Sequence, residues 1–180
     1  HIFANIGDGT YFHSGILAVR QSVASGVNIT YKILYNDAVA MTGGQPVDGV
    51  ISVDAIARQV ESEGVQALAI VSDDIAKFNT IKNRFPAIAT FHPREELDTV
   101  QRRLREVTSV SVLIYEQTCA AEKRRRRKKG ELSDPARNLM IHEGVCEGCG
   151  DCGVQSNCVA VLPHETLWGR KRKIDQTHCN

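Results

Sequence analysis

The sequence of 180 residues predicts an α/β fold in which a mostly parallel sheet is covered by helices. Two runs, Ile29–Tyr35 and Ser109–Tyr115, are apolar and rich in β-branched residues, which indicates strands buried on both faces. Segments with apolar residues at helical spacing alternate with strand-like runs along residues 1–119. Such strand–helix alternation favours a parallel sheet with helices on both faces.

The first part of this predicted domain contains two strands joined by a helix. His1–Ile6 is a short strand that ends at Gly7-Asp8-Gly9. Ser14 is expected to cap the helix and Gly26 to end it, because hydroxyl groups accept first-turn N–H groups and glycine adopts the left-handed conformation at helix ends. The inward stripe of this helix is Ile16, Val19 and Val23.

The second part adds two helices and further strands after a loop, Asn36–Gly49. Ser52 is expected to cap a helix that ends at Gly64. Pro93 is placed at the first position of the next helix, where its missing N–H has no partner to lose. The apolar stripes of the two helices are Val53, Ile56 and Val60, and Leu97, Val100 and Leu104. The additional predicted strands are Ala67–Val71 and Ala87–Phe91.

Polar residues follow the first two predicted strands where each strand ends. Asp8 follows the first, and Asn36 follows the second; Asp73-Asp74 falls at the same edge. Ligands of parallel sheets bind beyond the carboxyl ends of the strands. A carboxylate and an amide oxygen at one place suit a hard cation such as Mg²⁺, which keeps positions for phosphate oxygens. Gly7 and Gly9 would let the backbone turn tightly and approach a diphosphate. Taken alone, a Gly-Asp-Gly turn and an unrelated asparagine explain these residues equally well.

Two stretches carry a family resemblance, GDGTYFHSG at residues 7–15 and YNDAVAMTGGQP at residues 35–46. They resemble the thiamine diphosphate enzymes, above all the 2-oxoacid:ferredoxin oxidoreductases and, within them, the branch that acts on indolepyruvate. The resemblance covers essentially the whole chain and puts Cys146–Cys158 where the family carries iron–sulfur ligands. Many thiamine enzymes have two asparagines after the spacer, whereas Asn36-Asp37 here suits the ferredoxin-linked branch.

The resemblance implies the thiamine diphosphate-binding fold of the diphosphate type and assigns roles to single residues. Asp8, the side chain of Asn36 and the carbonyl of Ala38 would bind Mg²⁺ together with two diphosphate oxygens. The residues implied to line the cofactor are Gly7, Gly9, Ser14, Thr42 and Gly43. His13 lies near enough in sequence to face the thiazolium side and is the catalytic candidate, although a lone histidine is as often structural.

The implied activity is oxidative decarboxylation of a 2-oxo acid, with indolepyruvate expected by resemblance and pyruvate or another 2-oxo acid as the alternative. The acyl group would pass to coenzyme A and the electrons to ferredoxin. Thiamine chemistry also needs a carboxylate at the aminopyrimidine, and the sequence shows one set of strand-end signals only. We therefore expect the pyrimidine-binding half on another domain or subunit of an intact homo-oligomer. The chain, which begins without methionine, is expected to be a piece that does not turn over by itself.

Five of the six cysteines fall in the last 35 residues, and three of them form a CxxCxxC motif at Cys146, Cys149 and Cys152. Close CxxC steps after a cysteine-poor α/β segment favour a metal in a reducing compartment, here the cytoplasm, over disulfides. Three cysteines in tandem favour a 4Fe-4S cluster, while zinc remains the rival. The segment 146–180 is thus predicted to be a small, truncated ferredoxin-like segment.

The fourth cluster ligand stays open. Cys158 would serve a second cluster together with Cys179 if the two-cluster ferredoxin arrangement holds, or would complete the first cluster itself. The proline that usually follows the fourth cysteine is replaced by Val159. Cys119 is interpreted as a buried or neutral thiol rather than a ligand.

The net charge of +1 conceals two differently charged parts. Residues 1–119 contain 10 Lys or Arg against 13 Asp or Glu, whereas residues 120–180 contain 12 against 8. The basic excess begins with seven consecutive basic residues, Lys123–Lys129, in a connector predicted over residues 120–145. Such a run can bind nucleic acid, but no aromatic residues are interleaved to stack on bases. A solvated helix or linker that docks acidic ferredoxin or another domain is the favoured interpretation.

Other classes of protein remain open. An iron–sulfur electron-transfer or binding module without chemistry of its own fits the cysteine motif, and a nucleic-acid protein with a structural zinc fits the motif and the basic run together. A membrane protein is not indicated, because no apolar run approaches the ~18 residues that span a bilayer.

Overall fold

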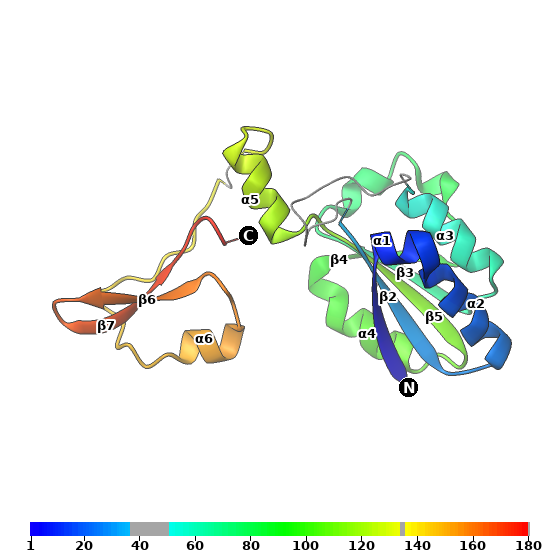
Figure 1. Ribbon diagram of the computed structural model, residues 1–180, viewed down its shortest axis with the longest axis horizontal. Coiled ribbons are helices and arrows are strands. Elements are labelled where there is room, and N and C mark those ends of the chain that lie inside the picture. The colour runs from blue at the N-terminus through cyan, green and yellow to red at the C-terminus, as the bar shows by residue number, and fades with distance from the viewer. Residues whose placement is uncertain (37–50, 134–135, 180) are drawn as a thin grey trace. The chain divides into compact units, whose positions relative to one another are not determined.

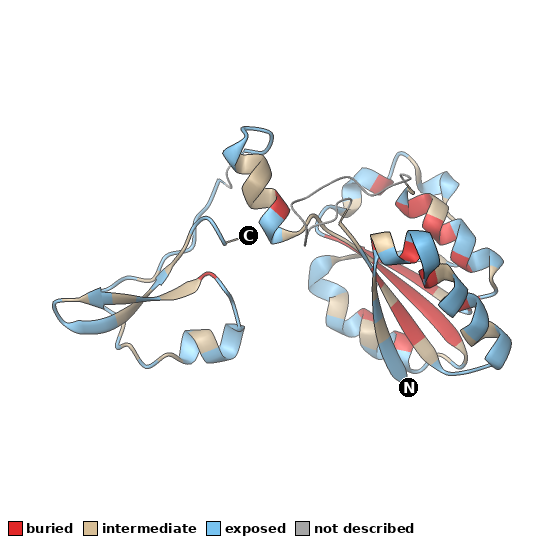
Figure 2. Cartoon of the chain, viewed as in Figure 1, coloured by how far each residue is buried: buried red, intermediate tan, exposed pale blue. Residues whose placement is uncertain are grey.

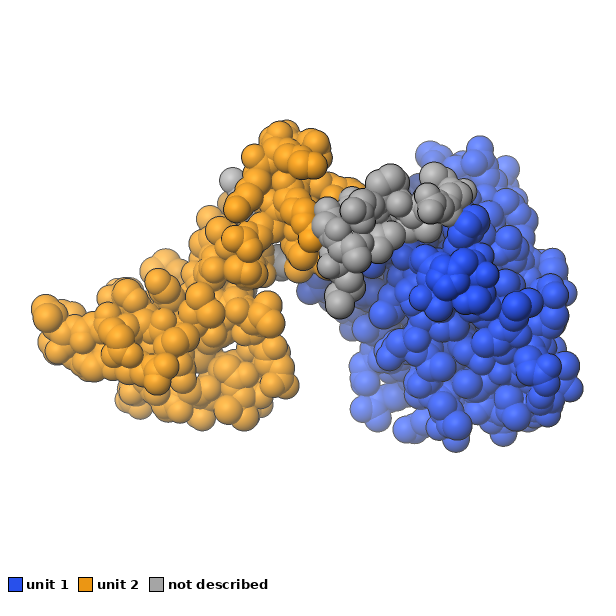
Figure 3. Space-filling model, viewed as in Figure 1, with its two compact units in different colours: residues 1–118 blue, residues 119–180 orange. Residues whose placement is uncertain are grey.

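The computed structural model describes residues 1–36, 51–133 and 136–179. They form two compact units, His1–Thr118 and Cys119–Asn180 (Figure 3). Within the described part of the chain, no helix is long and apolar enough to cross a membrane.

The first unit is built on a five-stranded sheet in which every pair of neighbouring strands is parallel (Figure 1). Its strands are β1 (Ile2–Gly7), β2 (Ile29–Tyr35), β3 (Ala67–Ser72), β4 (Ala89–Pro93) and β5 (Val110–Glu116), in the order β1-β2-β5-β3-β4. Its α-helices are α1 (Asp8–Thr10), α2 (Ile16–Ser25), α3 (Val53–Ser62) and α4 (Leu97–Arg105), with a π-helical turn η1 (Tyr11–Gly15) and 3₁₀ turns η3 (Ile75–Phe78), η4 (Lys82–Arg84) and η5 (Arg94–Glu96). The prediction of an α/β fold with a mostly parallel sheet is confirmed.

Helices pack on both faces of the sheet, so most residues of its strands β3 and β5 are buried (Figure 2). On one face, Val19 of α2 and Ile56 of α3 belong to the same buried cluster as Ile33 and Ile114 of the sheet. On the other face, α4 buries its stripe against alternate residues of β3 and β5, because successive side chains of a strand point to opposite faces. That second cluster is Ala69, Val71, Val100, Leu104 and Leu113.

The strand register aligns the carboxyl ends of the strands at one edge. Gly7 of β1 pairs with Leu34 of β2, and Tyr35 of β2 pairs with Glu116 of β5. Ser72 of β3 pairs with the same Glu116. The residues that directly follow β1, β2 and β3 therefore begin at the same edge of the sheet, with the end of β5 between those of β2 and β3.

The helix after β1 begins earlier than the sequence indicates. Ser14 was expected to cap it, but helical turns run without a break from Asp8 through η1 into α2, so Ser14 lies inside the helix and the prediction is wrong. The N-cap is Gly7, which has an extended backbone. Asp8 makes the early start favourable, because a carboxylate in the first turn interacts well with the positive end of the helix.

Pro93 and its strand are also shifted from prediction. The strand is Ala89–Pro93 rather than Ala87–Phe91, and Pro93 closes it instead of opening a helix. The chain then passes through η5 before α4 begins at Leu97. Pro93 can sit in a strand here because β4 is the last strand of the sheet, where a missing N–H interrupts no further pairing.

The predicted helix ends at Gly26 and Gly64 are confirmed, since both have positive φ angles, 64° and 93°. Ser52 does occupy the N-cap of α3 with an extended backbone, but its side chain makes no capping bond. Its carbonyl instead accepts the N–H of Ile56 at 3.0 Å, the first bond of the helix.

The second unit has little buried apolar surface. It contains α5 (Ala120–Lys128), α6 (Asp151–Ser156) and an antiparallel pair of strands, β6 (Val161–Thr166) and β7 (Gly169–Ile174). Ala160 is its one fully buried hydrophobic residue among those described. Most of the basic run lies on α5, where Glu122 is buried and forms ion pairs with Arg125 and Arg126 at 2.9 and 3.1 Å.

Candidate functional site

Asp8 and Asn36 are neighbours at the carboxyl edge of the sheet. Asp8 is buried, with 5% of its surface exposed, and its Oδ2 accepts the backbone N–H of Asn36 at 3.0 Å. Its Oδ1 accepts the N–H of Gly9 at 2.8 Å. The parallel pairing of β1 with β2 thus brings together two of the residues predicted to bind a metal ion.

Gly7 and Gly9 leave open space beside this carboxylate. A Cβ added to either glycine would meet no atom of the described residues within 4 Å. Neither glycine has a positive φ angle, so the backbone conformation alone does not require glycine, contrary to the tight turn expected from the sequence. Among the described residues, nothing obstructs the backbone of these glycines next to the helix N-terminus, which is the arrangement that favours close approach of an anion.

His13 and Ser14 lie farther along the same helical segment, and both are exposed. Ser14 Oγ is 2.9 Å from His13 Nδ1, so the two side chains contact each other. Three other predicted site residues, Ala38, Thr42 and Gly43, lie outside the described residues.

An oxygen donor set beside open backbone fits the needs of Mg²⁺ and a diphosphate. The carboxylate of Asp8, next to the end of β2, offers oxygen ligands of the kind that Mg²⁺ prefers. The first turn of the helix offers N–H groups that favour a phosphate.

A second polar cluster at the same edge was missed by sequence reasoning. Ser72, fully buried at the end of β3, donates to Glu116 Oε2 at 2.6 Å, and Lys77 forms an ion pair with the same oxygen. Ser72 Oγ also accepts the N–H of Asp74 at 3.1 Å. The sequence did contain a signal for this cluster. Glu116 is a carboxylate at the end of a buried strand, much as Asp8 is a carboxylate directly after a strand. This cluster links the carboxyl end of β3 to that of β5 through side chains.

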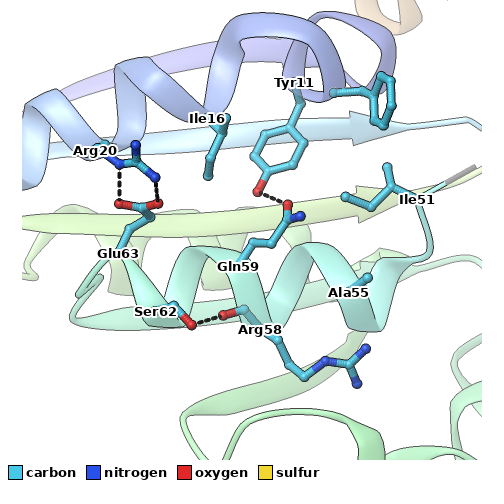
Figure 4. Close-up of a pocket in the computed structure, with 10 residues that line it drawn as sticks. Tyr11, Ile16, Arg20, Ile51, Ala55, Arg58, Gln59, Ser62 and Glu63 are labelled. Carbon is cyan, nitrogen blue, oxygen red and sulfur yellow. Dashed lines mark hydrogen bonds and ion pairs between the residues drawn. The ribbon is translucent and has the colours of Figure 1, made fainter. Parts of the chain in front are cut away.

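A cavity of about 530 Å³ in the first unit lies elsewhere, between the start of the first helical segment and α3 (Figure 4). Its polar groups are already paired. Tyr11 donates to Gln59 Oε1 at 3.0 Å, and Arg20 forms two bonds to Glu63 at 2.9 and 2.6 Å. Burial, and then the negative charge of Glu63, raise the pKa of Tyr11 far above its ordinary value. None of the predicted site residues that the structure describes lines this cavity, and its paired polar groups indicate helix packing rather than a ligand site.

The predicted cluster ligands of the second unit are unpaired thiols. None of the six cysteines forms a disulfide; Cys149, Cys152 and Cys158 are exposed, and Cys146 and Cys179 are half-buried. In residues 1–36, 51–133 and 136–179, no three His, Cys, Asp or Glu side chains are gathered closely enough to hold a metal ion. The structure therefore does not bring the predicted iron–sulfur ligands together.

The turn that carries the first cysteines is nevertheless held in place by the β6–β7 hairpin. Gly148 has a φ angle of 74°, and a Cβ added there would lie 2.3 Å from the carbonyl oxygen of Arg170. Lys171 Nζ donates to the carbonyl of Cys146 at 2.5 Å. Accessible thiols on a glycine-rich turn are a donor set that fits an iron–sulfur cluster, and cluster binding commonly orders the segment that supplies it.

The fold and these two regions define an α/β protein with an oxygen-lined sheet edge, followed by a cysteine-rich unit. No family model matches the chain, and no solved structure matches it. Curated relatives do match. The chain is 29% identical to indolepyruvate oxidoreductase subunit IorA of Thermococcus kodakarensis over 99% of its own length, and 27% identical to subunit IorA of Pyrococcus abyssi over 99%. It is 28% identical to subunit IorA of Methanothermobacter marburgensis over 91%.

The resemblance inferred from the motifs is confirmed: the chain is similar to indolepyruvate oxidoreductase IorA subunits over nearly all of its length. The chain spans about a quarter of the length of the curated relatives it matches, 25%, 25% and 24% of the three subunits named.

Proposed function

We propose that this chain forms the Mg²⁺- and diphosphate-binding part of a thiamine diphosphate-dependent 2-oxoacid oxidoreductase. The observation that carries the proposal is the contact between the buried carboxylate of Asp8 and the N–H of Asn36 at adjacent strand ends. Similarity to the IorA subunits over 99% of the chain supports it. Indolepyruvate is the proposed substrate because the relatives are named for it; pyruvate or another 2-oxo acid is the alternative.

In this proposal, Asp8, the Asn36 side chain and the Ala38 carbonyl hold Mg²⁺, while Gly7, Gly9, Ser14, Thr42 and Gly43 line the cofactor. Thiamine diphosphate, when bound, supplies the carbon nucleophile and the electron sink that decarboxylation of a 2-oxo acid requires. The Asp8 carboxylate would balance part of the metal charge, and it holds the backbone of Asn36 at the end of β2. His13 is exposed one helical turn beyond Gly9 and is the proposed residue for proton transfer.

The cysteine unit is proposed to hold a 4Fe-4S cluster through Cys146, Cys149 and Cys152, with Cys158 or Cys179 as a further ligand. Such a cluster accepts electrons singly and would pass them to ferredoxin, with coenzyme A capturing the acyl group. The pyrimidine-activating carboxylate is proposed to lie on another domain or subunit of a homo-oligomer, and the cytoplasm remains the predicted location. The exposure of three of the thiols supports cluster binding over burial in a core.

Thiamine diphosphate binding to the purified chain tests the metal site. We expect weak binding with Mg²⁺ and none after chelation with EDTA. Asp8→Asn keeps the side-chain shape but removes the charge, and should weaken binding about tenfold or more, a loss of ~1.4 kcal/mol or greater. Asp73→Asn removes one charge from an exposed residue at the same sheet edge and serves as the matched control. If thiamine diphosphate binds equally well without Mg²⁺ and to Asp8→Asn, the proposed metal site is wrong. Turnover of indolepyruvate by the chain alone would show that no separate pyrimidine-binding half is needed.

A further inference from the structure

A pocket of about 510 Å³ in the second unit is lined by basic side chains. Arg124, Arg125 and Lys128 of α5 border it together with His178. None of the described residues that line it is acidic. A concave, positively charged surface of this volume is of the size that binds small molecules.

Two of these cations lack the partners that their neighbours have. Arg125 and Arg126 are bound to the buried carboxylate of Glu122. Arg124 and Lys128 form no ion pair with any described carboxylate. They are four residues apart on α5 and therefore lie on one side of the helix.

Arg124 also contains a buried donor without an acceptor. Its Nε is shielded from solvent and has no hydrogen-bond partner among the described residues. Its Nη1 donates to Nε2 of His178 at 3.2 Å, which holds the guanidinium against this ring and leaves Nε as the donor without a partner. A buried N–H without an acceptor is unfavourable, so a negatively charged acceptor in the pocket would stabilise this arrangement.

The pocket reaches the N-terminal turn of α5, where the helix backbone offers further donors. Cys119 is the N-cap, and its side chain makes no capping bond. Ala120 and Ala121 line the pocket with methyl groups only, which leaves room for a ligand next to the first turn. First-turn N–H groups and the positive end of a nine-residue helix both favour an anion.

We propose that this pocket binds the phosphate or diphosphate group of a small molecule. Arg124 and Lys128 supply the charge, and Arg124 additionally supplies fixed N–H donors that match phosphate oxygens. No Phe, Tyr or Trp among the described residues lines the pocket, so it lacks the large aromatic surfaces on which bases of a nucleic acid stack. The inference does not depend on the proposed Mg²⁺ site.

Calorimetric titration of the full 180-residue chain with inorganic pyrophosphate in EDTA tests it, because chelation removes any Mg²⁺-dependent binding at the sheet edge. We expect Arg124→Gln and Lys128→Gln each to weaken binding about tenfold, the effect of losing one charge-assisted interaction. Lys129→Gln removes the same charge at the C-cap of α5, outside the pocket lining, and should change the affinity by less than about twofold, as expected for a screened surface charge.

Circular dichroism spectra of the three variants establish that α5 is intact, and the exposed Lys128 provides a test if Arg124→Gln disturbs the fold. Equal losses in all three variants would show diffuse electrostatic attraction and overturn the proposal. So would the absence of pyrophosphate binding, including the case in which a single-stranded RNA binds instead.

Discussion

The buried carboxylate of Asp8 accepts the backbone N–H of Asn36 at 3.0 Å and that of Gly9 at 2.8 Å. One side chain thereby connects the end of β1 to the end of β2. The same contact makes Asp8 structurally important whether or not a metal ion is bound.

Asp8→Ala removes both acceptors and should lower the free energy of unfolding by about 1–3 kcal/mol, the usual effect of leaving buried donors unsatisfied. Asp8→Asn keeps one acceptor oxygen and should lose less. Urea unfolding of the metal-free chain measures both. If Asp8→Ala unfolds at the same urea concentration as the unaltered chain, the contact between the two strand ends does not stabilise the fold.

The Tyr11 hydroxyl predicts a loss of stability at high pH. Burial, the main cause, and the charge of Glu63 raise the pKa of Tyr11 in the folded protein above its ordinary value of 10.0. Because the folded pKa is the higher one, the stabilisation is complete below pH 10 and is lost as the pH rises beyond it. Tyr11→Phe should therefore show a smaller loss of stability above pH 10 than the unaltered chain.

Tyr115 has to be measured alongside, because burial raises its pKa as well and would contribute to the same loss of stability at high pH. Urea unfolding at several alkaline pH values in Tyr11→Phe, Tyr115→Phe and the double variant separates the two contributions. An identical pH profile for Tyr11→Phe and the unaltered chain would contradict the prediction.

The stability contributed by Glu122 on α5 should depend on pH in the opposite sense, being lost in acid rather than in alkali. Its hydrogen bond from Arg125 is the main cause that holds its pKa below the usual value, followed by contacts with Arg126. A lowered folded pKa contributes stability above the unfolded pKa of 4.5 that disappears as the pH falls through the folded value. Glu122→Gln should reduce helix stability at neutral pH by about 0.5–1 kcal/mol, the sum expected for two helix ion pairs.

Amide hydrogen exchange in α5 measures this effect for the helix alone. The difference between Glu122→Gln and the unaltered chain should shrink in acid, where both carry a neutral side chain at this position. Glu131→Gln, on an exposed residue after the helix, is the charge-matched control. A difference that persists unchanged into acid would indicate a packing effect instead of an ion pair.

Anaerobic reconstitution with iron and sulfide tests the cysteine unit. We expect visible absorption and equal amounts of bound iron and acid-labile sulfide in the unaltered chain. Cys149→Ser should abolish both, because a hydroxyl is a poor ligand for iron–sulfur clusters. Cys119→Ser, outside the CxxCxxC motif, should retain them. Tight binding of zinc without any sulfide would favour the rival structural site.

Gly148 and Gly153 form a matched pair for the conformation of the cysteine turn. Gly148→Ala would place a Cβ 2.3 Å from the Arg170 carbonyl oxygen at a φ angle of 74°, whereas a Cβ at Gly153 would meet no atom of the described residues within 4 Å. A positive φ for a residue other than glycine costs about 1–3 kcal/mol. Cluster loading should therefore fall in Gly148→Ala and stay unchanged in Gly153→Ala. Equal loading in both variants would show that the hairpin does not hold the turn.

The order of strands and helices follows from local pattern. Ile29–Tyr35 was predicted with its observed bounds because a strand buried on both faces is continuously apolar and ends where polar residues begin. Gly26 and Gly64 were readable as helix ends because left-handed backbone angles strongly favour glycine. The motif around Asp8 also indicated the resemblance to the indolepyruvate oxidoreductases.

Contacts between distant segments determined the rest. The carboxylate of Asp8 favours a helix start locally, but the observed bounds of this helix and of the strand that ends at Pro93 were not located by local signals alone. The Ser72–Glu116 contact joins residues 44 positions apart that meet only because β5 lies between β2 and β3. Local preferences are weak compared with the energy of packing and pairing, so residue types reveal which elements form, while tertiary contacts decide where they begin and which side chains meet.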